Sequence, residues 1–190
     1  MTTFHNRRLP HFHSVGQATF VTWRLHGSLP PNRCFPPAIV SGQAFLAMDR
    51  ILDSTCDGPL FLRMPEVAQM VVDAIHYRDR RIYHLHAFVV MPNHVHLLMT
   101  PLVVVSKVLQ SLKRFTAREG NRMLGLTGQP FWQDESYDRL VRNDTEFAHI
   151  AHYIERNPVT AGLATTPEEY PWSSVGRVSN PPQVDNLPHI

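Results

Sequence analysis

The sequence is poor in several features that define whole classes of protein. It contains only two cysteines among its 190 residues, too few for a disulfide framework or for a zinc site built from thiolates. It has no glycine-rich phosphate-binding loop, and no apolar run approaches the roughly 18 residues of a membrane-spanning helix. The first ten residues lack the apolar stretch of a secretory signal. We therefore expect a cytoplasmic protein with no membrane partner.

The overall composition is that of one globular domain. Hydrophobic residues make up 43% of the chain and charged residues 18%, which argues against wholesale disorder. A chain of this length can bury one proper core but is short for two. We expect a single domain over residues 1–176, followed by a proline-containing and loosely attached tail over residues 177–190.

Positive charge is concentrated in one part of the chain. The span from Arg78 to Arg122 holds eight basic and two acidic residues, a net charge of +6, whereas the remainder holds ten basic and fourteen acidic residues, a net charge of −4. Arginine supplies sixteen of the eighteen cations, and its guanidinium group binds phosphate through two hydrogen bonds. This distribution indicates a local surface for a polyanion; an ordinary solvated surface is the alternative.

Hydrophobic periodicity predicts an α+β domain. The order of predicted elements is β-α-α-β-β-α-β-α, which favours an antiparallel sheet with helices packed on one face. We expect strands at 18–25, 82–91, 94–100 and 137–141, and the Pro-Asn break at 92–93 joins the second and third as a hairpin. We expect helices at 38–53, from Pro65 onward, at 104–119, and from Asn143 to near Asn157. Asn143 and Glu146 have capping-box spacing, and Pro158 ends the last helix.

The pair His94 and His96 is the first candidate for chemistry. Side chains alternate along a strand, so both imidazoles point to one face and Val95 points to the other. Two imidazoles on one face can reach a single divalent ion. A His-x-His pair is weak by itself in a chain with twelve histidines, and unrelated core or surface histidines are the alternative.

The second candidate is the pair Tyr153 and Asn157. Residues four apart lie on one helix face, about one turn from each other. A reachable tyrosine hydroxyl can attack phosphorus, and an asparagine can offer an amide oxygen to a metal. A half-buried packing role for Tyr153 is the alternative.

Candidate DNA-binding residues come from the basic span and from an aromatic near it. Lys107, Lys113, Arg114 and Arg118 could follow a phosphate backbone. Trp132 could stack on an unpaired base, although an aromatic residue beside a strand commonly belongs to the core.

Two longer segments resemble a known family. MPNHVHLL at 91–98 resembles the HUH motif of single-tyrosine transposases, and YIERNPVTAGL at 153–163 resembles the tyrosine helix of the REP-associated branch of that family. Further agreements are LPH at 9–11, FVTWR at 20–24, FWQDESYDR at 131–139 and YPWSS at 170–174. The resemblance runs from about residue 9 to residue 174.

The resemblance implies a ferredoxin-like antiparallel sheet, a divalent metal (Mg²⁺ or Mn²⁺) bound by His94 and His96, and Tyr153 as the nucleophile. It implies single-stranded DNA substrates that contain palindromic REP-type hairpins, and a covalent 5′-phosphotyrosine intermediate. Related enzymes commonly use glutamine where this chain has Asn157, a shorter amide that we expect to complete the metal site. Members act as monomers or homodimers.

Two other functions compete with this prediction. A domesticated hairpin-binding protein would bind DNA with little or no catalysis. A zinc hydrolase would use His84 and His86 together with His94 and His96, and its activity would not depend on Tyr153.

Overall fold

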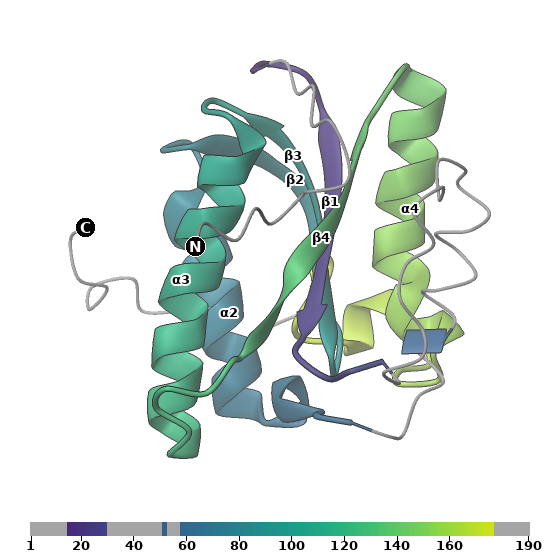
Figure 1. Cartoon of the computed structure of the whole chain (residues 1–190). Coiled ribbons are helices and arrows are strands. Elements are labelled where there is room, and N and C mark those ends of the chain that lie inside the picture. The colour runs from purple at the N-terminus through teal and green to yellow at the C-terminus, as the bar shows by residue number, and fades with distance from the viewer. Residues whose placement is uncertain (1–14, 30–50, 53–57, 177–190) are drawn as a thin grey trace.

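Four antiparallel strands form the centre of the structure, a computed structural model that describes residues 15–29, 51–52 and 58–176 (Figure 1). The order across the sheet is β2-β3-β1-β4. The strands are β1 (Thr19–Leu25), β2 (Tyr83–Val90), β3 (His94–Pro101) and β4 (Trp132–Leu140). Helix α2 (Pro65–Arg78) lies between β1 and β2 in the chain, and α3 (Val105–Leu124) lies between β3 and β4. This is the split β-α-β arrangement of ferredoxin-like folds, so the predicted α+β class and antiparallel sheet are confirmed.

The predicted hairpin is formed by β2 and β3. The two strands pair from Tyr83 opposite Pro101 to Val90 opposite Val95, and the amide of Met91 donates to the carbonyl of His94 at 2.9 Å to close the turn. Strand β4 begins at Trp132, five residues before the start that we predicted. The polar residues of β4 obscure the alternation of apolar and polar residues from which its start was predicted.

Helix α4 (Asp144–Thr160) carries the predicted tyrosine. Its first turn is capped by Asn143, whose side-chain oxygen accepts from the Glu146 amide at 2.8 Å, as the spacing predicted. The predicted end near Asn157 is wrong, because the helix continues past Pro158 to Thr160. A proline in the last turn removes only its own N–H, and the Ala161 amide still donates to the Asn157 carbonyl at 2.9 Å.

Some predictions lie outside the described residues. They are most of the helix at 38–53, the motif at 9–11 and the tail at 177–190. Within the described ranges, no helix combines the length and the hydrophobicity needed to cross a membrane.

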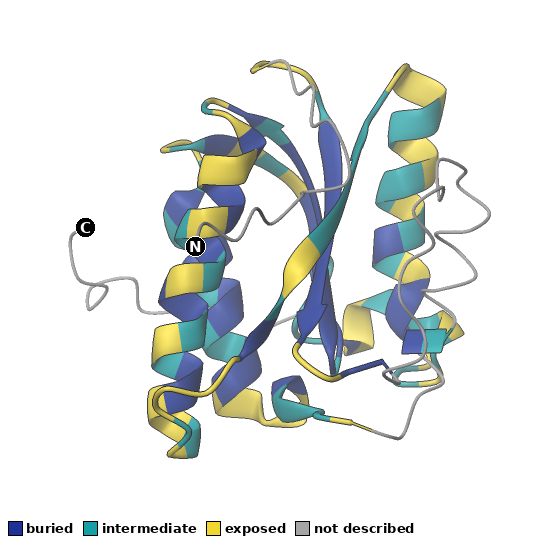
Figure 2. Cartoon of the chain, in the orientation of Figure 1, coloured by how far each residue is buried: buried dark blue, intermediate teal, exposed yellow. Residues whose placement is uncertain are grey.

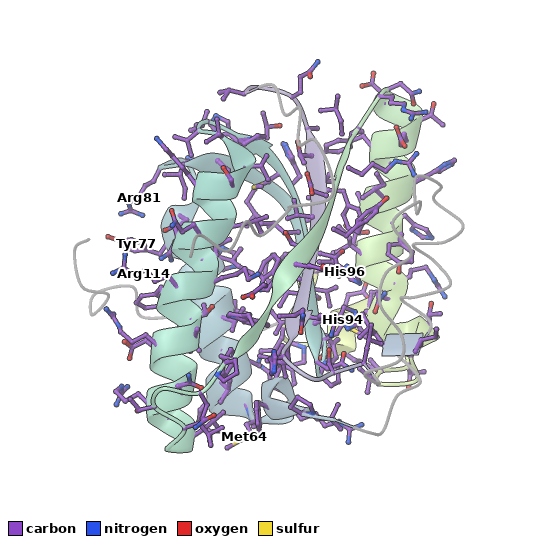
Figure 3. All side chains as sticks on the ribbon, viewed as in Figure 1. Met64, Tyr77, Arg81, His94, His96 and Arg114 are labelled. Carbon is purple, nitrogen blue, oxygen red and sulfur yellow. The ribbon has the colours of Figure 1, made fainter. Side chains whose placement is uncertain are left out.

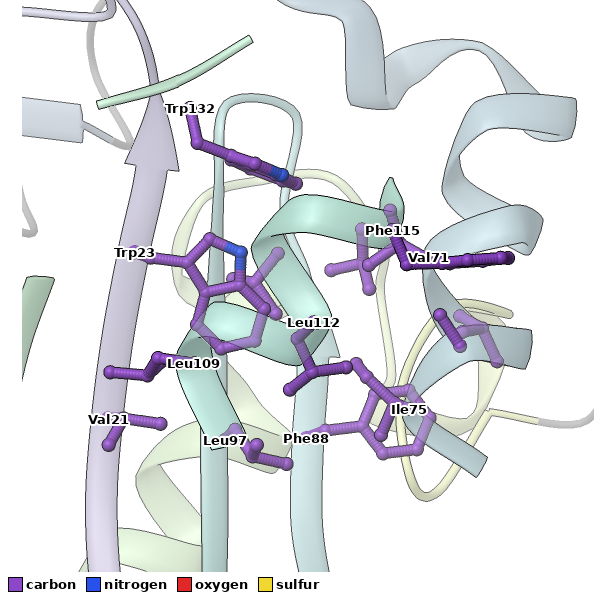
Figure 4. Close-up of a cluster of buried hydrophobic side chains, with 14 of the residues drawn as sticks. Val21, Trp23, Val71, Ile75, Phe88, Leu97, Leu109, Leu112, Phe115 and Trp132 are labelled. Atoms are coloured by element: carbon purple, nitrogen blue, oxygen red, sulfur yellow. The ribbon is translucent and has the colours of Figure 1, made fainter. Parts of the chain in front are cut away.

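The larger core lies between the sheet and the helices α2 and α3. Alternate residues of the inner strands, such as Trp23 and Leu97, pack there against Ile75 of α2 and Leu112 of α3 (Figure 4). All four side chains are no more than 1% exposed. This layer agrees with the prediction of helices on one face.

The opposite face of the sheet is also covered, which corrects the prediction that all helices share one face. Helix α4 packs there, and its Ile154 joins Phe20, Val89 and Leu98 in a second, smaller core. Strands β1 and β3 are buried almost throughout (Figure 2), so each carries apolar side chains on both faces. A strand that is apolar on both faces needs a cover on both.

The segment after α4 closes one edge of the sheet. The Val90 amide donates to the Trp172 carbonyl at 2.8 Å, and the Ser174 amide donates to the Phe88 carbonyl at 2.9 Å. The Tyr170 hydroxyl adds a hydrogen bond to the Val90 carbonyl at 2.8 Å. The YPWSS motif at 170–174 therefore covers the outer edge of β2, which would otherwise expose unpaired backbone groups.

Candidate active site

His94 and His96 lie on the face of β3 that α4 covers (Figure 3). Both side chains are fully buried, and Val95 between them packs into the core on the other face. The alternation predicted from the sequence is therefore present. Their Nε2 atoms approach each other to 3.0 Å, so the two rings converge on one point.

This convergence fits a divalent ion. Two ligand atoms at right angles around an ion, each about 2.1 Å from it, lie about 3.0 Å apart, and Mg²⁺ prefers such octahedral geometry. Neutral imidazole nitrogens also suit Mn²⁺. The His pair therefore has the spacing of two adjacent ligands of one ion.

Both rings are oriented by hydrogen bonds at their other nitrogen. The Nδ1 atom of His94 is 2.7 Å from Asn93 Oδ1, and the Nδ1 atom of His96 is 2.7 Å from Thr22 Oγ1. Partners of this kind orient the rings of metal-binding histidines. We did not predict either residue from the sequence: Asn93 is signalled only by its place before His94, whereas Thr22 is found only from the register of β1 against β3.

Asn157 and Tyr153 approach the His pair from α4. The Nδ2 atom of Asn157 is 3.5 Å from His96 Nε2 and donates to the Tyr153 hydroxyl oxygen at 3.3 Å. Asn157 is 2% exposed, and Tyr153 is half-buried with its ring centre 5.7 Å from that of His96. The structure thus brings together Tyr153, Asn157, His94 and His96, as predicted, and one chain supplies all four.

Phe20 forms the wall beside these residues. Its ring stacks on His96 with ring centres 5.6 Å apart and meets the edge of Tyr153 at 6.5 Å. A buried aromatic ring here limits the positions that the tyrosine can take.

A buried cation lies on the same face. Arg24 is the cross-strand neighbour of His94, is 8% exposed, and donates from Nη1 to Ser28 Oγ at 3.3 Å. A guanidinium group beside the His pair makes this part of the sheet favourable for an anionic ligand such as phosphate.

His84 and His86 do not join the site. His84 pairs with Thr100, whereas His96 pairs with Val89 five residues further along β2, and His86 Nε2 bonds to Thr100 Oγ1 at 2.8 Å. Across the described ranges, no group of three or more His, Cys, Asp or Glu side chains is placed to hold a metal. The four-histidine zinc site is therefore wrong.

The prediction that Trp132 stacks on DNA is also wrong. Its side chain is 6% exposed and belongs to the core under α2 and α3, where its ring meets that of Trp23 (Figure 4). Its Nε1–H group donates to Thr116 Oγ1 at 2.9 Å. The indole is held inside the domain, so no face of it is free for a base.

The predicted basic residues lie on α3, across the sheet from the His pair. Lys107, Arg114 and Arg118 are exposed, and Arg114 lies at the far side of the molecule from His94 and His96 (Figure 3). The Lys113 ammonium donates to the carbonyls of Gln133 and Asp134 at 2.7 and 2.9 Å, so it ties α3 to β4. The basic stripe of α3, which we define as Lys107, Arg114 and Arg118, is thus separate from the candidate active site.

Comparisons with known proteins agree with this arrangement. Residues 66–157, which include both histidines, Tyr153 and Asn157, match the family described as Transposase IS200 like. Over this span the chain is similar to the IS200-like transposases.

Within that class, the chain is similar to the REP-associated tyrosine transposase of Escherichia coli (strain K12), with 29% identity over 100 residues. This alignment covers 53% of the chain and 58% of the relative, so the chain spans a little over half the length of that protein. The solved structure of a REP-associated tyrosine transposase bound to a REP hairpin has the same fold. Its TM-score is 0.55 at 18% identity, and the alignment covers 92% of this chain and 82% of that chain.

We expect His94→Ala and His96→Ala each to abolish the binding of Mn²⁺, because each removes one of the two converging nitrogens. Val95→Ala is the matched control, since this neighbour points to the other face. It should bind Mn²⁺ normally but lower the free energy of unfolding by roughly 1–3 kcal/mol. Calorimetric titration with Mn²⁺ and urea unfolding measure the two effects. Normal Mn²⁺ binding by either histidine variant would refute the metal assignment.

Proposed function

We propose that this chain cuts and rejoins single-stranded DNA at palindromic hairpins of the REP type, with Tyr153 as the nucleophile. The observation that carries the proposal is the convergence of Tyr153 and Asn157 on α4 with the His pair on β3. A tyrosine hydroxyl beside two imidazoles suited to a metal can attack a phosphodiester. Hairpin DNA as the substrate is supported by the similarity to a transposase that was solved with a REP hairpin.

Mg²⁺ or Mn²⁺ is the proposed cofactor, with His94, His96 and Asn157 as its protein ligands. The fit rests on the 3.0 Å between the two Nε2 atoms. Rotation of the Asn157 amide about its terminal bond exchanges oxygen and nitrogen and turns its oxygen toward the same point. When bound, the ion neutralises charge on the scissile phosphate and stabilises the oxygen that leaves.

The reaction makes and breaks one bond to phosphorus in each step. The Tyr153 oxygen attacks phosphorus and loses its proton to solvent, while the bond from phosphorus to the DNA 3′ oxygen breaks. That oxygen takes up a proton and is released as a 3′ hydroxyl, and the 5′ phosphate stays on Tyr153 as an ester. Attack by a 3′ hydroxyl then rejoins the strand and restores the tyrosine, so joining needs no nucleotide cofactor.

Asn157 has a second task in this reaction. A free tyrosine has a pKa of about 10 and is a poor nucleophile at neutral pH. The terminal amide atom of Asn157 that faces His96 also lies 3.3 Å from the Tyr153 oxygen. Once rotation places the amide oxygen there, it accepts from the Tyr153 hydroxyl and polarises its O–H bond. Asn157 thus links the nucleophile to the metal site.

Tyr153→Phe should abolish cleavage and leave hairpin affinity nearly unchanged, because the ring stays and only the nucleophilic oxygen is removed. Nicking of a labelled hairpin oligonucleotide, followed on a denaturing gel, measures the first effect, and a binding isotherm measures the second. Nicking at the normal rate by this variant would refute Tyr153 as the attacking group. If the unmodified protein itself binds hairpins but never nicks them, it is a hairpin-binding module instead.

The 5′ linkage makes a separate prediction about which DNA end stays on the protein. An oligonucleotide labelled on the 3′ side of the nick should become attached to Tyr153, and a label on the 5′ side should be released with a free 3′ hydroxyl. Denaturing electrophoresis of the protein shows which label is retained. Transfer of the 5′-side label, or release of both ends, would contradict the proposed mechanism.

A second DNA-binding surface is proposed on the basic stripe of α3. Lys107 and Arg118 are eleven residues apart, which corresponds to about 16 Å along a helix. A stripe of this length can follow several phosphates of a DNA strand. Because it lies across the sheet from Tyr153, we assign it to the hairpin stem, and the scissile strand to the His pair.

Changing both Arg114 and Arg118 to alanine should weaken hairpin binding and flatten its salt dependence, by roughly one unit of log–log slope for each phosphate that the protein no longer neutralises. Arg63 and Arg142 are a matched control pair, because they are also exposed but lie on other segments. Affinities measured between about 50 and 200 mM salt give the slope. Equal slopes for the two double variants would show that the stem does not bind to α3.

A further inference from the structure

The His pair belongs to a chain of three hydrogen bonds whose two ends differ in chemistry. The chain runs from Thr22 Oγ1 to His96 Nδ1 at 2.7 Å, from His96 Nε2 to His94 Nε2 at 3.0 Å, and from His94 Nδ1 to Asn93 Oδ1 at 2.7 Å. All four residues are no more than 6% exposed. Buried polar groups keep such bonds, because an unmade bond costs about 1–3 kcal/mol.

The Asn93 end of the chain is fixed. The Nδ2 group of Asn93 donates to the Leu52 carbonyl at 3.0 Å, so the amide cannot turn over and its oxygen must face His94. An amide oxygen only accepts. The proton of neutral His94 therefore lies on Nδ1, and its Nε2 atom carries a lone pair.

The remaining protons follow from that end. Since His94 Nε2 can only accept, the 3.0 Å approach of the two Nε2 atoms is a hydrogen bond when His96 carries its proton on Nε2. The Nδ1 atom of His96 then accepts from the Thr22 hydroxyl. In this arrangement each of the three bonds has one donor and one acceptor.

Metal binding by both rings requires the opposite proton position on one ring. A histidine that gives its Nε2 lone pair to an ion carries its proton on Nδ1. His94 already satisfies this condition, whereas His96 must move its proton to Nδ1 and donate it to Thr22. A hydroxyl group both donates and accepts, so Thr22 can serve both arrangements by rotating its O–H bond.

We propose that Thr22 is a positioning residue whose hydroxyl reverses its hydrogen bond to His96, which lets the His pair change from a mutual hydrogen bond to a two-nitrogen metal site. This inference rests on the proposed metal role of the His pair. The net protonation of the two rings stays the same, and only the position of the His96 proton changes. Asn93 has no such freedom, so His94 keeps one tautomer throughout.

The ¹⁵N chemical shifts of the histidine rings test the proposal directly in the full chain, at a pH where both rings are neutral. Without divalent ions, His94 should be the Nδ1–H tautomer and His96 the Nε2–H tautomer. On addition of Mg²⁺, which is diamagnetic, His96 should become the Nδ1–H tautomer. His94 should remain the Nδ1–H tautomer. If His96 carries its proton on Nδ1 before Mg²⁺ is added, the reversal does not occur and the proposal is wrong.

Two variants separate the role of the hydroxyl from simple packing. Thr22→Val keeps the shape but cannot accept from Nδ1–H, so Mn²⁺ affinity should fall by about 10- to 100-fold. Thr22→Ser keeps the hydroxyl and should stay near the wild-type affinity. Unchanged Mn²⁺ binding in Thr22→Val would overturn the proposal, and the wild-type tautomers decide it even if that variant does not fold. Neither measurement uses DNA, so a failure here is distinct from a failure of Tyr153-dependent cleavage.

Discussion

Strand β3 has to bury both of its faces while carrying two imidazoles, and the rest of the structure depends on how this is done. Val95 and Leu97 point into the larger core, and His94 and His96 point toward α4. The imidazoles can be buried because neighbouring side chains supply hydrogen bonds at 2.7 Å to their outer nitrogens. A slip of one residue between β1 and β3 would take Thr22 away from His96 and turn apolar side chains of β1 onto the polar face. The geometry of the site therefore depends directly on the register between β1 and β3.

The two faces of the sheet have different proposed roles in DNA cleavage and DNA binding. The face under α4 holds the converging nitrogens, which fit a divalent ion, together with Tyr153 and the buried guanidinium of Arg24, which suits a phosphate group. The face under α2 and α3 contains the large apolar core, and the basic stripe lies on the outer side of α3. A DNA hairpin that binds to both faces has to pass around an edge of the sheet. Strand β4, half-buried and next to both α3 and α4 (Figure 1), forms the edge that the described segments leave open.

Local sequence patterns predicted much of the fold and the centre of the site. The Pro-Asn break between two apolar runs predicted the β2–β3 hairpin, alternation placed both imidazoles on one face, and the four-residue spacing placed Asn157 one turn from Tyr153. These features depend on neighbours in sequence, so a single sequence reveals them. Their convergence from β3 and α4 came from the family resemblance, because nothing local joins two segments about sixty residues apart.

The missed features all depend on long-range packing. Thr22 touches His96 through strand pairing across 74 residues, and no local pattern reports that register. Trp132 looked available for stacking, but the crossing of α3 over β4 puts Thr116 beside its indole nitrogen. The position of α4 on the second face follows from strands that are apolar on both sides. The continuous apolar run at 87–90 is a sign of such a strand, but periodicity alone cannot distinguish it from a buried helix. The stripe on α3 was correctly predicted as basic. Its position across the sheet from the site follows from the topology of the fold, which no local pattern reports.

The closure of the β2 edge by residues 170–174 has a consequence for synthesis on the ribosome. The hairpin of β2 and β3 emerges early, but the segment that pairs with its outer edge is made about eighty residues later. At about 5–20 residues per second, the nascent chain carries an open, apolar strand edge for some seconds. During that interval the outer edge of β2 carries unpaired backbone groups, and a truncation just before residue 170 would make that exposure permanent.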